Sequence, residues 1–129
     1  MTKTIFTLFF CLLLLNSCNT LFSSDDKIKA FLPGTYVNLA ESEFSKAIDT
    51  LLIRKEGLDG NTYSITRKVS FQRIRAGVIQ PKEYQREQWV AIYDEKQEVL
   101  HEMKRFRTIC YVPEKSKLWL ANNEYEKIQ

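Results

Sequence analysis

The sequence has very little of several residue types on which common protein chemistries depend. Its 129 residues include one His, three Cys, four Gly and three Pro. It contains no Gly-x-Ser-x-Gly elbow, Walker loop or dinucleotide fingerprint, and one His with scattered Cys does not make a zinc site. With 44% hydrophobic residues the chain is too apolar for disorder. We therefore predict a folded protein that is not an enzyme and has no cofactor and no metal site.

Charge of one sign is also lacking. The 19 basic and 16 acidic residues give a net charge of +3, which offers no electrostatic case for binding nucleic acid. The basic residues are densest within 67–75 and 104–107. These clusters could face anionic headgroups or an acidic partner, but strand alternation would split each across two faces. Solvated charge is the favoured interpretation.

The longest apolar run is short and lies near the start. It spans residues 5–15 after Lys3 and is followed by Asn-Ser-Cys, ending at Cys18. A finished transmembrane helix needs about 20 residues, whereas this run is typical of a secretory signal peptide. The Leu-x-small-Cys ending resembles the lipobox of bacterial lipoproteins. That resemblance implies cleavage before Cys18, a diacylglycerol group on its sulfur, acylation of its amino group, and retention on the bilayer.

The remaining cysteines then fit an envelope protein without a disulfide. Cys11 leaves with the leader, so Cys110 has no intramolecular partner in an oxidising compartment. We expect it to be a small buried apolar side chain rather than a reactive thiol. The predicted organisation is a signal peptide over 1–17, the lipidated Cys18 with a flexible tether over 18–30, and one globular domain over 31–129.

The domain pattern is mostly short strands. Residues 63–73 alternate cleanly, and turn signals recur at residues 56–61, 75–78, 94–97, 113–116 and 122–123. Seven or eight strands at this spacing predict an all-β antiparallel meander, forming a small barrel or sandwich. The opening Gly34-Thr35-Tyr36 gives a lipocalin-like analogy only. Apolar spacing also predicts one short helix near 39–47, and the charged segment 124–128 is expected to be an edge strand.

Two residues in the strands are candidates for function. Arg67 points with the apolar set of its strand. It could pair with a carboxylate inside a barrel or line the mouth of a ligand cavity, and packing of its stem with a solvated head is favoured. The sole histidine, His101, could be a general base or metal ligand, but a packed or partly exposed strand histidine is the default. Carboxylate pairs such as Glu41/Glu43 are interpreted as solvated.

Several segments besides the lipobox are similar to a known group. They are FLPGTYVN at 31–38, SEFSKAIDTL at 42–51, YDEK at 93–96 and EYEKI at 124–128. They resemble the small envelope lipoproteins of Bacteroides-type bacteria that are encoded with conjugative transposons. The resemblance would span about residues 31–128. The resemblance implies an envelope lipoprotein linked to mobile-element transfer. We expect the outer membrane as its location, and the periplasmic and surface leaflets both stay open. The resemblance supplies no catalytic residue.

Three hypotheses follow. The first is a lipid-anchored, non-enzymatic β domain that contacts envelope proteins, such as those within or beside a transfer apparatus. The second is a lipocalin-like carrier that holds a small apolar ligand, with Arg67 or aromatic residues at its pocket. The third, least favoured, is an enzyme that uses scattered carboxylates. A filled core would favour the first, and an internal cavity of roughly 300 Å³ or more would favour the second.

Overall fold

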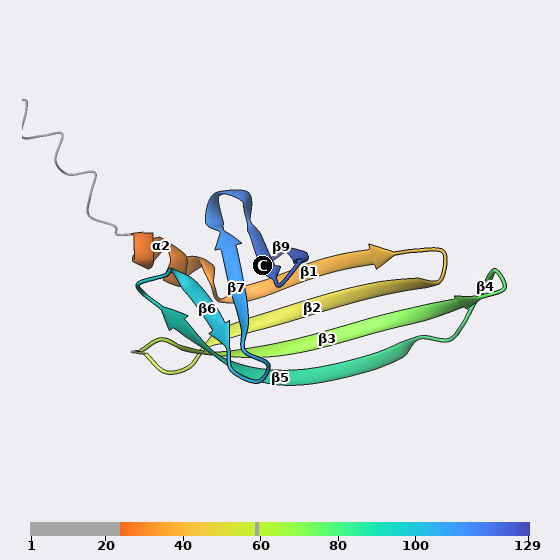
Figure 1. The fold of residues 1–129 in the computed structure, drawn as a ribbon, viewed down its shortest axis with the longest axis horizontal. Coiled ribbons are helices and arrows are strands. Elements are labelled where there is room, and N and C mark those ends of the chain that lie inside the picture. The colour runs from red at the N-terminus through yellow and green to blue at the C-terminus, as the bar shows by residue number, and fades with distance from the viewer. Residues whose placement is uncertain (1–23, 59) are drawn as a thin grey trace, which may run out of the picture.

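The computed structural model describes residues 24–58 and 60–129, and it is mostly antiparallel β-sheet with one short α-helix. Figure 1 shows the arrangement, with the elements in chain order. They are α2 (Ser24–Phe31), β1 (Gly34–Glu41), β2 (Ser45–Lys55), β3 (Thr62–Arg75), β4 (Val78–Ile79), β5 (Glu83–Asp94), β6 (Val99–Glu102), β7 (Arg107–Val112), the 3-10 turn η2 (Pro113–Lys115), β8 (Lys117–Leu120) and β9 (Asn123–Lys127).

Eight strands close into a barrel. Their order is β2-β1-β9-β8-β7-β6-β5-β3, and β3 pairs back onto β2. Strand β4 is extra and pairs only with the end of β3. The predicted all-β meander with one short helix is confirmed, and the choice between barrel and sandwich is resolved as a barrel. Strand β9 is not an edge, because it lies between β8 and β1.

The strands differ greatly in length, and this gives the molecule its shape. β2 and β3 pair over eleven positions, from Ser45↔Arg73 to Lys55↔Tyr63, whereas β9 reaches β1 only at Tyr36 and Val37. The four long strands β1, β2, β3 and β5 therefore run on past β6–β9, with β4 at the far tip (Figure 1). We call this projection, residues 38–49 and 69–86, the arm.

Alternation along the long strands fills the barrel with large side chains. The largest of them are Trp89 and four tyrosines, each no more than 2% exposed. Exposed polar residues alternate with them, as expected for a half-buried antiparallel sheet. The core residues that the strands contribute are Tyr36, Leu51, Ile53, Tyr63, Ile65, Trp89, Ala91, Tyr93, Leu100, Ile109, Leu118, Leu120 and Tyr125.

Helix α2 packs against the barrel at the end opposite the arm. It buries Ile28 and Phe31, and Leu32 follows with no exposure. The last carbonyl groups of a helix lack intrahelical partners. Here the Tyr36 hydroxyl lies 2.8 Å from the Phe31 carbonyl oxygen, and Lys127 Nζ donates to that oxygen at 2.5 Å. The tether predicted over 18–30 is therefore wrong from residue 24 onward, because the spacing of these apolar residues makes an amphipathic helix.

The helix predicted near 39–47 is also wrong. This segment is the β1–β2 hairpin, in which Leu39 pairs with Ile48 and Ala40 with Ala47. Ser42 builds the turn, because its Oγ accepts hydrogen bonds from the amides of Phe44 and Ser45 at 3.2 Å each. The apolar residues before and after the turn lie on two different strands. Their spacing across the turn matches that of one helical face only by coincidence.

Candidate functional site

Arg67 lies inside the barrel, where the arm begins, and is held by a carboxylate. Its Nε is 3.0 Å from Asp49 Oδ1 and its terminal nitrogen is 2.6 Å from Asp49 Oδ2. Tyr125 donates to the same Oδ2 at 2.6 Å. The hydrogen bond to Asp49 raises the pKa of Arg67, and burial raises that of Tyr125. Both groups therefore stay protonated, and Arg67 serves this bidentate ion pair rather than lining a pocket.

A second internal network lies beside the first. The fully buried Glu102 accepts a hydrogen bond from Arg107 Nε at 3.1 Å and from the amide of Arg105. The guanidinium of Arg107 stands 4.4 Å from the centre of the Trp89 ring, and that of Arg67 stands 5.8 Å from it. Glu87 accepts from Trp89 Nε1 at 3.0 Å and from Arg105 at 3.1 Å.

These two networks occupy the end of the barrel that joins the arm. Each of their carboxylates, those of Asp49, Glu87 and Glu102, accepts hydrogen bonds from at least two donors. Among the described residues, no group of three or more His, Cys, Asp or Glu side chains is arranged to hold a metal ion. The first network joins β2, β3 and β9, and the second joins β5, β6 and β7.

The other sequence candidates lie apart. His101 is half-exposed on β6, with Nε2 3.6 Å from Asp94 Oδ2. Cys110 is a free thiol on β7 and is exposed. The expectation that Cys110 is buried is wrong, because Ile109 takes the inward position and the next residue faces out. Cys18 lies outside the described residues. Within the described ranges, no helix has the length and apolar character needed to cross a bilayer.

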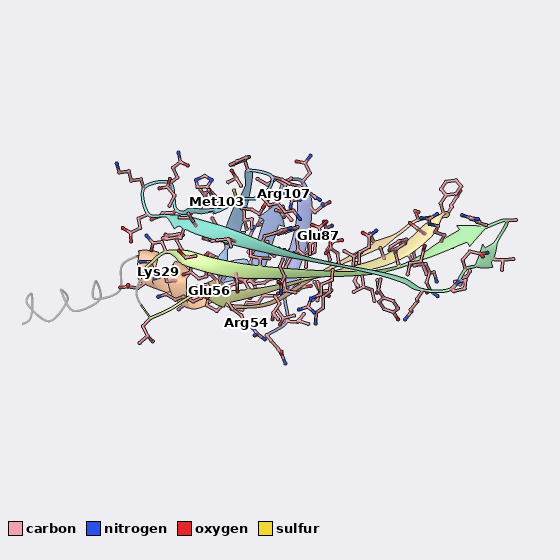
Figure 2. All side chains as sticks on the ribbon, turned by 90° about the horizontal axis from the view of Figure 1, so that it is seen from below. Lys29, Arg54, Glu56, Glu87, Met103 and Arg107 are labelled. Atoms are coloured by element: carbon pink, nitrogen blue, oxygen red, sulfur yellow. The ribbon has the colours of Figure 1, made fainter. Side chains whose placement is uncertain are left out.

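The arm exposes apolar side chains out of proportion to its size. Leu39 and Tyr84 are each 74% exposed, Phe44 is 75% exposed and Ile48 is 46% exposed. With Val78 and Ile79, the arm carries six of the twelve exposed large hydrophobic residues of the described chain. Figure 2 shows the side chains of the arm standing on both faces of its twisted sheet. Isolated exposed apolar residues are ordinary, but such a concentration is typical of an interaction site.

The outer face of β2, β3 and β5 is hollowed along its length. One hollow of about 430 Å³ is lined by residues that include Arg54, Thr66, Lys68 and Arg86. A second of about 370 Å³ shares Lys68 and Arg86 with the first. A third of about 410 Å³ shares Ile48 and Ser70 with the second. We call this continuous depression the outer trough. It runs from the wall of the barrel to the arm, and sequence reasoning did not find it.

Fold and surface together define a closed eight-stranded antiparallel barrel with a filled interior and a projecting arm. Comparison with known proteins does not place the chain in a family. No family model matches the chain, and no curated protein and no solved structure matches it either.

Proposed function

We propose that this protein is a lipid-anchored envelope protein that presents a rigid, non-enzymatic β domain to a protein partner. The observation that carries the proposal is the combination of a filled barrel with an arm that exposes Leu39, Phe44 and Tyr84. The barrel supplies rigidity, and the arm supplies apolar contact area at a distance from the anchor. Interfaces draw much of their binding energy from a few anchor residues, among which aromatic side chains are enriched.

The anchor is Cys18, on the strength of its lipobox. Only five residues separate Cys18 from Ser24, where α2 begins. Six peptide steps extend at most about 20 Å, so the α2 end of the barrel stands close to the headgroups. The arm projects from the opposite end (Figure 1). In this arrangement the outer membrane holds the domain, and the arm reaches toward a partner such as a component of a conjugal transfer apparatus.

The carrier alternative has less support. A lipocalin-like carrier needs an internal cavity of about 300 Å³ or more. The positions that would surround it are taken by Tyr36, Tyr63, Tyr93 and Tyr125, none more than 2% exposed. Arg67, the residue proposed for its mouth, is engaged by Asp49. The hollows described above lie outside the barrel.

Membrane fractionation tests the anchor. Cys18→Ser is expected to move the protein from the membrane to the soluble fraction, and Cys110→Ser, which removes the exposed thiol of β7, is the matched control. Mass spectrometry of the wild-type N-terminus is expected to show a diacylated or triacylated Cys18. An uncleaved leader with an unmodified thiol would disprove the anchor.

Site-specific photo-crosslinking in cells tests the arm. A photoreactive residue at Tyr84 is expected to trap a defined envelope protein, whereas the same residue at Lys104, on the barrel, is not. Leu39→Asp with Tyr84→Asp is expected to lower transfer frequency of the mobile element without lowering the amount of protein. Equal crosslinking from both positions, or unchanged transfer, would contradict the interaction role.

A further inference from the structure

We propose that the outer trough binds an extended, acidic segment of the partner protein, which rests on the proposed function and names the partner's chemistry. The first step is shape. The middle hollow shares lining residues with each of the other two, and together the three follow β3 from Ser64 to Gln72. The eight residue-to-residue steps from Ser64 to Gln72 span about 26 Å. A depression of that length, open to solvent along one side, suits a chain segment of about eight extended residues better than a compact small molecule.

The second step is charge. The lining of the trough carries five cations and two carboxylates. One carboxylate, Glu41, is 3.4 Å from Lys46. The other four cations are Arg54, Lys68, Lys82 and Arg86, and none makes an ion pair within the described part of the chain. By contrast, Arg67 and Arg73, on the opposite face of β3, are both paired.

The third step is the placement of two of these cations. Lys68 and Arg86 are direct register partners across β3 and β5, and both line the two hollows that meet there. Like charges directly opposite each other destabilise a sheet. A bound carboxylate between the two side chains would turn this repulsion into two attractive contacts. The pair therefore marks the point at which the acidic residues of the segment would bind.

The fourth step is the apolar row that crosses the trough. Leu39 pairs with Ile48, Ile48 with Ser70, and Ser70 with Tyr84, so these side chains share one face in one line. The partner segment should therefore carry apolar residues beside its carboxylates. A membrane surface fits less well, because the anchor holds the opposite end of the molecule near the headgroups. Nucleic acid fits less well because the row offers a single aromatic ring for stacking.

The test uses the full chain purified in detergent and a fluorescent ten-residue synthetic peptide of alternating Glu and Leu. Fluorescence anisotropy is expected to show binding that weakens as salt rises. Lys68→Gln/Arg86→Gln is expected to weaken it at least tenfold, with a melting temperature equal to or above that of wild type. The matched control, Lys96→Gln/Lys115→Gln, removes two exposed cations outside the trough and is expected to stay within twofold. Ile48→Ser/Tyr84→Ser should weaken binding several-fold.

Three results would overturn the inference. They are failure of the wild-type chain to bind the Glu-Leu peptide, equal weakening by the trough and control variants, and no peptide binding while phosphatidylglycerol vesicles or single-stranded DNA bind through Lys68 and Arg86. A Gln-Leu peptide that binds as tightly as the Glu-Leu peptide would also contradict the proposal, because it would show that the carboxylates of the segment do not contribute to binding. These measurements do not depend on lipidation or on transfer, so peptide binding with failed fractionation or crosslinking would separate the trough from the proposed function.

Discussion

The ion pair between Arg67 and Asp49 gives the sharpest prediction about stability. Their side chains are 23% and 12% exposed, and Tyr125 also donates to Asp49. Arg67→Met keeps most of the side-chain volume but leaves the carboxylate with the tyrosine alone. Breaking a fully buried pair costs about 3–5 kcal/mol, and residual solvent screening reduces this. We expect a loss of about 2–3 kcal/mol, or about 10 °C in Tm.

Further substitution should restore stability rather than remove more of it. Asp49→Leu with Arg67→Met replaces the pair by apolar groups, which is often close to neutral. The Tyr125 hydroxyl then lacks its acceptor, at a cost of about 1 kcal/mol. Adding Tyr125→Phe should remove that cost and bring the triple variant within about 1 kcal/mol of wild type.

Equilibrium unfolding in urea, followed by the fluorescence of Trp89 and Trp119, measures the series by linear extrapolation. Arg73→Met is the matched control, because Arg73 lies on the same strand and face but its ion pair with Glu83 is 53% and 49% exposed. It should change the free energy of unfolding by less than about 0.5 kcal/mol. Equal effects of Arg67→Met and Arg73→Met, or steady loss along the series, would refute the reasoning.

Three other predictions concern the barrel ends and the turns. Leu32→Ala, at a fully buried position beneath α2, should cost about 2–5 kcal/mol in urea unfolding; a loss under 1 kcal/mol would mean that the helix end is not part of the core. The hydrogen bond from the Gln97 amide lowers the pKa of Asp94, so its stabilising contribution is present above the ordinary carboxylate range and is lost as pH falls through the lowered value. Asp94→Asn should therefore flatten stability between about pH 5 and pH 2, and an unchanged pH profile would contradict this. His101→Ala should change neither crosslinking from the arm nor peptide binding, and loss of either would give this histidine a role.

Local patterns predict the strands well because each depends on nearby residues alone. The alternation of Tyr63, Ile65, Val69 and Phe71 is visible in sequence, and these residues face one side of β3. Arg67 was correctly placed in this set. Its partner was not predictable, because Asp49 is diagonal to it across β2, where Leu51 is the direct register partner. That relation depends on a pairing register that no local pattern contains.

Sequence patterns gave wrong predictions where a segment carried the signals of two structures, or where the structure depended on closure of the barrel. The α2 signal was present, since Ile28, Phe31 and Leu32 have the i, i+3, i+4 spacing of one helical face, but the acidic and serine-rich start favoured a spacer. The segment 124–128 was expected to be an edge strand, but β9 lies inside the sheet because it pairs with β1, which is almost ninety residues earlier in the chain. The outer trough was missed because its cations lie on β2, on β3, on β5 and just before β5, and come together only in the folded sheet.

The ion-paired root of the arm has a consequence for its motion. Beyond the Arg67–Asp49 ion pair both faces of the sheet meet solvent, so burial of side chains specifies the strand register of the arm only weakly. The bidentate contact of Arg67 with Asp49 links β2 to β3 where the arm begins and favours the observed register. Amide hydrogen exchange in the arm should therefore be slowest near the Arg67–Asp49 ion pair and become faster toward β4. The tip of the arm could then bend to fit a bound partner while the register of β2 and β3 stays the same.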